Sequence, residues 1–150
     1  MSGSAAGAPL IREMRPNDLE QIVEIDRLVL GKARRDYWEI KLRQVQNRSQ
    51  FAALVAERDG RVIGFIIGGA SQGEYGVPEN VGWIDTIGVD PDHQRQGVAK
   101  LLFREMSDNL RQLGVVSIRT FVKRLDWKLL KFFADVGFSQ GDMVNLELDI

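Results

Sequence analysis

The residues best suited to chemistry in this chain lie at Gln94–Ala99, where a predicted strand leads into a predicted helix. The helix is indicated by apolar residues that recur at helical spacing, namely Leu102, Met106, Leu110 and Leu113. A helix N-terminus offers unpaired backbone N–H groups and the positive end of the helix dipole. Gly97 has no side chain to block an anion, and Arg95 adds a positive charge. The segment therefore predicts a phosphate-binding turn; a helix end that binds only water or a stray anion is the alternative.

Two other nucleotide-binding motifs do not fit this turn. A dinucleotide-binding fold needs three glycines in the order Gly-x-Gly-x-x-Gly, and the segment contains only Gly97. A Walker-type loop ends in Gly-Lys-Ser or Gly-Lys-Thr, whereas this segment reads Gly97-Val98-Ala99. Neither motif therefore accounts for the turn.

The composition excludes several classes of function. The 20 basic and 21 acidic side chains give a formal net charge of -1, so neither nucleic acid nor an anionic membrane surface is an expected partner. The chain has no cysteine and one histidine, which excludes a disulfide framework, a thiolate or multi-histidine metal site, and a cysteine nucleophile. The sequence shows no membrane-spanning run and no signal peptide, so the cytoplasm is the expected location.

The order of the predicted elements is that of an α/β domain with a mixed sheet. Apolar patterns and turn signals predict strands at residues 11–14, 51–57, 61–70, 83–89, 115–122 and 144–150. Helical periodicity predicts two helices between the first and second strands, one after Gly97, and one at 127–136. At 150 residues the chain is most simply one domain, at residues 10–150, preceded by a flexible tail at 1–9.

The turn and its surroundings resemble one known family. Gln94–Ala99 fits the pattern Gln/Arg-x-x-Gly-x-Gly/Ala, follows a strand that ends in Ile-Gly-Val-Asp-Pro, and precedes an amphipathic helix. From about Ile11 to Phe138 the chain resembles the GNAT superfamily of acyl-CoA-dependent N-acyltransferases. The resemblance implies a GNAT fold, with a mixed, mostly antiparallel sheet of six to seven strands, splayed between the fourth and fifth strands and flanked by four helices. Few residues separate Phe138 from the last predicted strand, so the acceptor side is expected to be open.

The resemblance also implies acetyl-CoA as co-substrate and a set of residues that bind it. The backbone amides of Gln96–Lys100 would hold the CoA pyrophosphate, and main-chain groups of Ile87–Val89 would pair with the pantetheine arm. Asp126 stands where the family usually has an asparagine that contacts CoA, although it also suits the N-cap of the following helix. The implied CoA-binding residues are Ile87, Gly88, Val89, Gln94, Arg95, Gln96, Gly97, Val98, Ala99, Lys100, Asp126 and Phe133.

Gly88 interrupts an otherwise apolar strand. Glycine inside a strand often marks a bulge or a close approach of two backbones, and the resemblance implies a bulge in this strand. A tight contact with a neighbouring helix is the alternative for Gly88.

The usual proton-transfer positions hold residues that cannot move a proton. Acetyl transfer needs a neutral amine, so a base must take a proton from it, and an acid can protonate the departing thiolate. By resemblance, the usual tyrosine acid falls on Phe133. Two common positions for the base fall on Phe121 and Trp83.

Asp85 remains as the candidate catalytic residue. It is a carboxylate in an otherwise apolar strand, which is costly unless the charge is paired or used. Strand alternation predicts that it shares a face with Trp83 and Ile87. A salt bridge, or a hydrogen bond to the Tyr75 loop, is the alternative to a role as general base.

These observations predict an enzyme that moves an acetyl group from acetyl-CoA to a primary amine by direct transfer in a ternary complex. A catalytically weak acyl-CoA-binding module or sensor is the alternative, and a purely structural domain would leave the Gln94–Ala99 turn as a coincidence. The acceptor is open among a protein N-terminus, a lysine, a polyamine and another small amine. Tyr37 and Trp38 lie where the family recognises acceptors, although Trp38 also falls in an apolar helical stripe typical of a core. An exposed terminal strand could pair across the axis of a homodimer.

Overall fold

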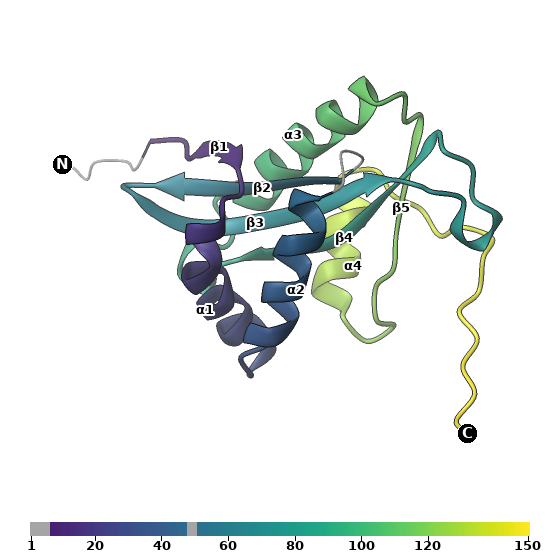
Figure 1. Ribbon diagram of the computed structural model, residues 1–150, viewed down its shortest axis with the longest axis horizontal. Coiled ribbons are helices and arrows are strands. Elements are labelled where there is room, and N and C mark those ends of the chain that lie inside the picture. Colours follow the sequence, from purple (N-terminus) through teal and green to yellow (C-terminus); the bar gives the residue numbers. More distant parts are fainter. Residues whose placement is uncertain (1–6, 48–50) are drawn as a thin grey trace.

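The computed structural model describes residues 7–47 and 51–150, and a five-stranded sheet lies at its centre (Figure 1). Residues 1–6, most of the predicted N-terminal tail, lie outside the described residues. All neighbouring strands are antiparallel except β4 and β5, which are parallel and are joined through a helix. The strands, in their order across the sheet, are β1 (Leu10–Glu13), β2 (Phe51–Arg58), β3 (Arg61–Ala70), β4 (Val81–Val89) and β5 (Ser117–Thr120).

Four helices flank the sheet, as predicted. Two of them lie together on one face of the sheet in Figure 1, and the helix between β4 and β5 packs on the opposite face. The helices are α1 (Leu19–Leu30), α2 (Arg35–Gln46), α3 (Val98–Gln112) and α4 (Trp127–Asp135). Short 3-10 helices precede α1, β4 and α3, at Pro16–Asp18, Glu74–Gly76 and Pro91–His93.

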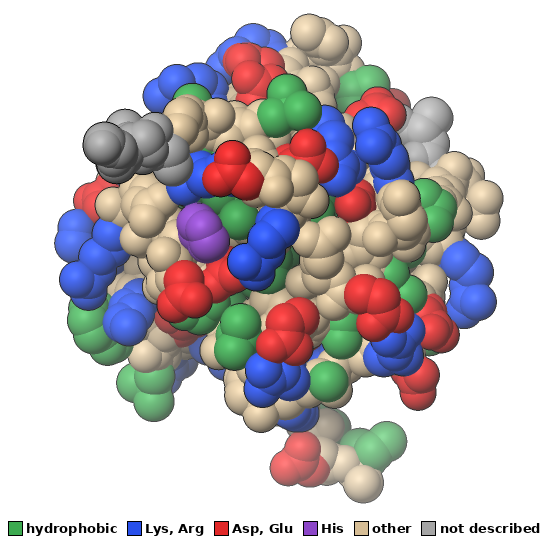
Figure 2. All heavy atoms as spheres, turned by 90° about the vertical axis from the view of Figure 1, so that its left-hand side faces the viewer, with side chains coloured by type: hydrophobic (Ala, Val, Ile, Leu, Met, Phe, Trp, Pro, Cys, Tyr) green, Lys and Arg blue, Asp and Glu red, His purple; other side chains and the backbone are tan. Residues whose placement is uncertain are grey.

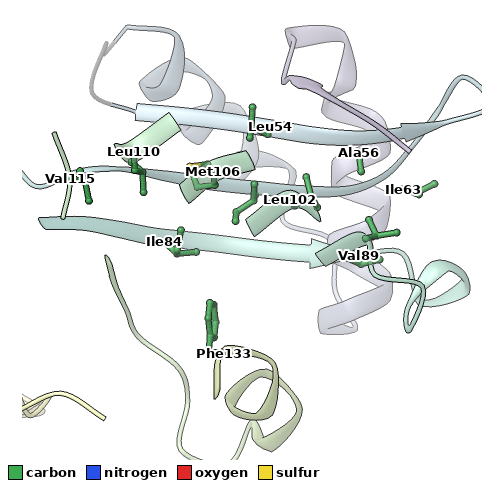
Figure 3. Close-up of a cluster of buried hydrophobic side chains, with 12 residues drawn as sticks. Leu54, Ala56, Ile63, Ile84, Val89, Leu102, Met106, Leu110, Val115 and Phe133 are labelled. Carbon is green, nitrogen blue, oxygen red and sulfur yellow. The ribbon is translucent and has the colours of Figure 1, made fainter. Parts of the chain in front are cut away.

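Each face of the sheet has its own apolar core. The buried stripe of α3 consists of Val98, Leu102, Met106 and Leu110, and it packs against β2, β3 and β4 (Figure 3). On the other face, Trp38 of α2 is fully buried and packs edge-on against Phe65 of β3, with ring centroids 5.0 Å apart. Because β3 is covered on both sides, its residues 62–69 are all buried. The helical spacing of Leu102, Met106 and Leu110 and the core position of Trp38 are confirmed, whereas Leu113, the last residue of the predicted stripe, lies just past α3 and is exposed.

The predicted sixth strand at residues 144–150 is wrong, since the sheet has five strands over the described residues. The segment lies outside the sheet, and its apolar side chains are exposed. Alternation indicates which side chains could share a face, but a strand forms only where a neighbour completes the backbone ladder. The fifth strand is also shorter than the predicted 115–122, since β5 spans Ser117–Thr120.

The surface mixes both signs of charge. Figure 2 shows Lys and Arg side chains interspersed with Asp and Glu side chains over one face, in keeping with the net charge of -1. In the described part of the chain, no helix combines the length and the apolar character needed to cross a bilayer. The same residues contain no group of three or more His, Cys, Asp or Glu side chains placed to hold a metal ion.

Candidate active site

The predicted splay lies between β4 and β5, which run together only along the first half of β4. Their pairing ends at Ile84 with Thr120, where the Thr120 hydroxyl donates to the Ile84 carbonyl at 2.9 Å. β4 continues along β3 as far as Val89. From Asp85 onwards, the edge of β4 that faces away from β3 is therefore not occupied by β5. An extended ligand could pair with the main-chain groups of that edge.

β4 bulges at Asp85, the first residue beyond the point where β5 leaves. Ile67 of β3 pairs with Thr86 and Gly68 pairs with Ile84, so Asp85 is the extra residue between them. A bulge bends its strand and re-aims the side chain of the extra residue. The bulge thus places one carboxylate at the start of the open edge.

The bulge also changes which residues share a face of β4. Ile84 is buried beside α3, and Ile87, three positions later, packs against the same cluster. Regular alternation would put these two side chains on opposite faces, and the extra residue at Asp85 restores them to one face. The prediction that Asp85 shares its face with both Trp83 and Ile87 is therefore wrong.

Gly88 allows close packing and does not mark the bulge. It pairs with Phe65 of β3, and a Cβ atom at Gly88 would lie 2.6 Å from Phe65 Cζ. The crowding group is an aromatic side chain on the neighbouring strand, and is neither the second backbone nor the neighbouring helix that the sequence indicated. The bulge predicted near Gly88 occurs three residues earlier, next to the point where the pairing with β5 ends.

Asp85 forms an ion pair with Lys41 of α2, with Nζ 2.6 Å from Oδ2. The Lys41 side chain is 17% exposed and that of Asp85 is 34% exposed, so the pair lies at the half-buried margin of the site. The salt bridge named as one alternative for Asp85 is therefore present. An ammonium in direct contact also shows that this carboxylate can receive a cation.

Tyr37 lies beside this ion pair, one turn before Lys41 on α2. Its ring is stacked by the Arg34 guanidinium, with the carbon 4.2 Å from the ring centroid, and Lys41 Nζ lies 5.6 Å from the same centroid. Burial raises the pKa of the Tyr37 phenol; the charge of Lys41 opposes this shift and the charge of Asp85 adds to it. Tyr37 therefore stays a neutral hydroxyl that can donate a hydrogen bond near Asp85.

The turn before α3 has the backbone geometry of an anion site. Arg95 and Gly97 both have left-handed backbone angles, with φ of 65° and 83°. Left-handed residues in such turns make successive N–H groups converge on one side. Gly97 is the N-cap of α3 and has no side chain to accept the N–H groups of residues 98–100. No atom lies within 4 Å of the place that a Cβ would take at Gly97, so an anion can approach the backbone.

Side chains on both sides fix this turn to the sheet. Gln94 Nε2 donates to the Val89 carbonyl at 3.1 Å, which ties the turn to the end of β4. Arg58 Nη1 at the end of β2 donates to Gln96 Oε1 at 2.7 Å. Within α3, Val98 is buried and Ala99 packs against the core, whereas Lys100 is exposed. Gln94 and Gln96 therefore anchor the turn, whereas Lys100 leaves a positive charge on its surface.

Asp126 lies directly before α4, and Phe133 lies on it. Asp126 is the N-cap of that helix, and its Oδ1 accepts the Leu129 N–H at 3.2 Å, so the predicted cap is present. Phe133 is buried, and Figure 3 shows its ring pointing from α4 toward β4. Its ring centroid lies 4.9 Å from that of Phe138. Phe133 thus contributes an apolar wall at the position where the sequence resemblance implies a tyrosine acid.

Sequence reasoning missed Lys41 and Arg58. Lys41 is four residues after Tyr37, so the spacing alone puts both on one face of α2. Its contact with Asp85 spans 44 positions, and the contact of Arg58 with Gln96 spans 38. No local pattern reports contacts over such separations, because they arise only when helix and sheet are packed together.

The acetyltransferase (GNAT) family matches residues 19–138 of the chain. Mycothiol acetyltransferase from Thermomonospora curvata is 28% identical over 103 residues, which are 68% of this chain and 33% of that protein. The chain therefore spans about a third of the length of this relative. GNAT acetyltransferases are acyltransferases that use acetyl-CoA as co-substrate.

Solved structures share the fold at low identity. The aminoglycoside N-acetyltransferase AAC(6')-Iy in complex with CoA has a TM-score of 0.81 at 19% identity, and 99% of each chain is covered. A transcriptional regulator from Bacillus halodurans C-125 has a TM-score of 0.79 at 16% identity, covering 95% of this chain and 99% of that one. The different names of these two proteins agree with the general rule that a fold does not specify a function. The family match, however, extends over most of the sequence, so the chain belongs to the acetyltransferase (GNAT) family.

Proposed function

We propose that this protein transfers an acetyl group from acetyl-CoA to a primary amine by direct transfer in a ternary complex. The observation that carries the proposal is the arrangement along β4. The open edge of β4 begins at Asp85, whose side chain is a carboxylate. It ends at the turn that precedes the N-terminus of α3. One extended donor lying along this edge would bring its acyl end near Asp85 and its phosphates to the turn.

The donor site is assigned mainly to backbone groups. The amides of Gln96–Lys100 would hold the pyrophosphate, with Arg95 adding charge and Gln94 anchoring the turn. Main-chain groups of Ile87–Val89 would pair with the pantetheine arm, because β3 occupies only the other edge of β4. The open space beside Gly97 supports this fit. Asp126 and Phe133 would border the donor from α4, the first as a polar cap and the second as an apolar wall.

Asp85 is proposed as the group that accepts the proton. An acceptor ammonium first gives one proton to the Asp85 carboxylate. The neutral nitrogen then forms a bond to the acyl carbon while the carbon–sulfur bond breaks, and it loses a second proton to solvent. Lys41 would hold the Asp85 carboxylate in place until a cationic acceptor competes for it. The acid position at Phe133 is apolar, but a thiol is acidic enough to leave as thiolate near neutral pH. Bound acetyl-CoA supplies the acyl group and this leaving group.

The acceptor class proposed is an amine that carries a positive charge in solution. The contact between Lys41 and Asp85 supports it, because a primary ammonium already occupies a place beside that carboxylate. The AAC(6')-Iy enzyme, which shares the fold, binds a bisubstrate analogue named CoA-S-monomethyl-acetylneamine. A protein N-terminus, a lysine side chain, a polyamine and an aminosugar all present such an ammonium.

The deciding experiment measures acetyl-CoA consumption with a panel of amines and peptides, next to calorimetry of CoA binding. We expect CoA to bind and at least one amine to be acetylated. CoA binding without turnover of any amine would favour the acyl-CoA-binding sensor, a function suggested by the apolar residue at Phe133. Failure to bind CoA at millimolar concentration would contradict both functions.

A further inference from the structure

Lys41 differs from the other lysines of this chain because its side chain is turned into the protein. The sequence has six lysines, all within the described residues, and the other five are exposed: Lys32, Lys100, Lys123, Lys128 and Lys131. The Lys41 side chain is 17% exposed, whereas that of Lys131, which also pairs with an aspartate, is 69% exposed. A lysine is rarely buried to this extent unless a partner holds its charge. The position of the Lys41 ammonium is therefore set by its contacts.

The packing of α2 fixes where this ammonium lies. Trp38 and Leu42, on either side of Lys41 in α2, are both buried, and Trp38 packs against Phe65 of the sheet. α2 is thereby held against the sheet (Figure 1), and Lys41 Nζ lies 2.6 Å from Asp85 Oδ2. Asp85 is the first residue of β4 beyond its pairing with β5. The Lys41 nitrogen thus lies at the start of the open edge of β4, where the acyl end of the donor is proposed to lie.

Arg34, the other cation beside Tyr37, already has an acidic partner. Its Nε and Nη2 donate to the two carboxylate oxygens of Asp26 at 2.9 Å and 3.0 Å, and its guanidinium lies over the Tyr37 ring. Lys41 Nζ lies 5.6 Å from the centroid of the same ring. Because Arg34 is held by Asp26, it does not compete with Lys41 for Asp85. A primary amine, a carboxylate that can take its proton and an aromatic ring therefore meet at one point.

We propose that Lys41 is a self-acetylation site, whose amine takes the acetyl group of acetyl-CoA bound to the same molecule. The Lys41 ammonium first gives one proton to the Asp85 carboxylate. The neutral nitrogen then forms a bond to the acyl carbon while the carbon–sulfur bond breaks, CoA leaves as a thiolate, and the nitrogen loses a second proton to solvent. The product is an uncharged amide, so the ion pair with Asp85 is lost. This reaction rests on the proposed function, because it uses the same donor and the same carboxylate.

The first test incubates the protein with acetyl-CoA that carries a deuterated acetyl group, without added amine, and maps the label by mass spectrometry of peptides. Lys131 is the matched control, because it also pairs with an aspartate but is exposed and lies on α4. Uncatalysed transfer favours exposed amines, so it would label Lys131 before Lys41. A digest at zero time gives the fraction of Lys41 that is unmodified at the start, to which the labelling is referred.

We expect Lys41 to be labelled first, at a rate per molecule that does not depend on protein concentration. Excess CoA should slow the labelling of Lys41 and leave that of Lys131 unchanged, because only the first reaction uses the donor site. Label on Lys131 that equals or exceeds that on Lys41 would overturn the proposal. A rate that rises with protein concentration would also overturn it, since the acetyl group would then pass between molecules.

The second test uses substitutions, with circular dichroism to check that each variant is folded. Asp85→Asn removes the proton acceptor, so the rate of labelling at Lys41 should fall by about two to four orders of magnitude. Asp135→Asn removes the partner of Lys131 and should leave the labelling of Lys41 unchanged. Lys41→Arg keeps a cation beside Asp85 but has no amine, so labelling of the whole protein should fall to the background of the exposed lysines. Labelling of Lys41 in Asp85→Asn at the parent's rate would refute self-acetylation through this carboxylate.

An added amine separates this reaction from the proposed function. Any amine that is acetylated should also slow the labelling of Lys41, because the two compete for one acetyl group and one carboxylate. Acetylation of an added amine with Lys41 unlabelled would refute the self-acetylation and leave the proposed function intact. CoA binding with neither Lys41 nor any amine acetylated would refute both.

Discussion

Lys41 Nζ lies 2.6 Å from Asp85 Oδ2, and this contact joins the middle of α2 to the bulge at which β4 continues without β5. The pair therefore connects α2 to the strand proposed to hold the donor. Because both side chains are partly exposed, the pair contributes little to stability, typically about 0.2–1 kcal/mol. Its position suggests that its main effect is on chemistry.

Replacing Asp85 separates a catalytic role from a structural one. Asp85→Asn keeps the shape and removes the proton acceptor, so turnover should fall by about two to four orders of magnitude with CoA affinity little changed. Lys41→Met breaks the same ion pair but leaves the carboxylate, so its turnover should stay well above that of Asp85→Asn. Rates and CoA affinities are measured for both proteins with the same amine.

The matched control for Asp85 is Asp135→Asn, which removes another exposed aspartate paired with a lysine, Lys131, at 2.9 Å. It should leave turnover unchanged. Equal rates for parent and Asp85→Asn across a pH profile would exclude Asp85 as the base. The reaction would then depend on the fraction of acceptor amine that is already deprotonated.

Gly97→Glu tests the assignment of the phosphate-binding turn. The new carboxylate would block the backbone and repel phosphate, so CoA should bind far more weakly and should no longer raise the melting temperature. Gly114→Glu is the control, because Gly114 lies past the other end of α3, also has a left-handed backbone (φ 89°), and is equally open. Both variants carry a similar backbone strain, about 1–2 kcal/mol. If both bind CoA like the parent, the turn is not the phosphate site.

Gly88→Ala tests the packing of β4 against β3. The added Cβ would lie 2.6 Å from Phe65 Cζ, so the free energy of unfolding should fall by about 1–3 kcal/mol, the usual cost of overpacking. Phe65→Leu removes the ring that is in the way, and the double variant should be more stable than the sum of the two single changes predicts. Urea unfolding of all four proteins measures this coupling. Strictly additive effects would mean that Phe65 is not the obstacle.

Asp18 provides a prediction about pH. Burial opposes its ionisation, but two hydrogen bonds from Arg12, each 2.9 Å, and one from the Arg15 N–H outweigh this and lower the pKa of Asp18. Because the folded-state pKa lies below the unfolded value of about 3.9, the stabilisation is present above that pH and is lost as the pH falls through the folded-state pKa. Arg12 keeps its ion pair with Glu57, 3.0 Å away, so Asp18→Asn should cost about 1–3 kcal/mol at pH 7, and the difference from the parent should shrink in acid.

The control for Asp18 is Glu24→Gln, which removes an ion pair with Arg27 that is exposed to solvent. That variant should unfold like the parent at pH 7, because water screens exposed pairs. Urea unfolding at several pH values between neutrality and acid measures both proteins. A difference for Asp18→Asn that stays constant down to strong acid would contradict the lowered pKa.

Features of the site that depend on short stretches of chain were predictable. The turn at Gln94–Ala99 was identified because a glycine, a helix start and an apolar stripe with four-residue spacing are all local properties. The N-cap at Asp126 was identified for the same reason. The family membership inferred from these motifs is confirmed, as are the α/β class with four helices and the parting of the fourth and fifth strands.

The sequence by itself therefore determined which segments are helices and that a helix begins directly after Gly97, because these depend on neighbours a few residues apart. The tertiary structure alone decided the number of strands, since Val144–Ile150 has the alternation of a strand but no neighbour to complete its ladder. It also decided that the bulge falls at Asp85, that Lys41 pairs with this residue, and that Phe65 fills the space beside Gly88. Strand register and contacts across 20 to 50 residues are outcomes of packing the whole sheet, and no short pattern encodes them.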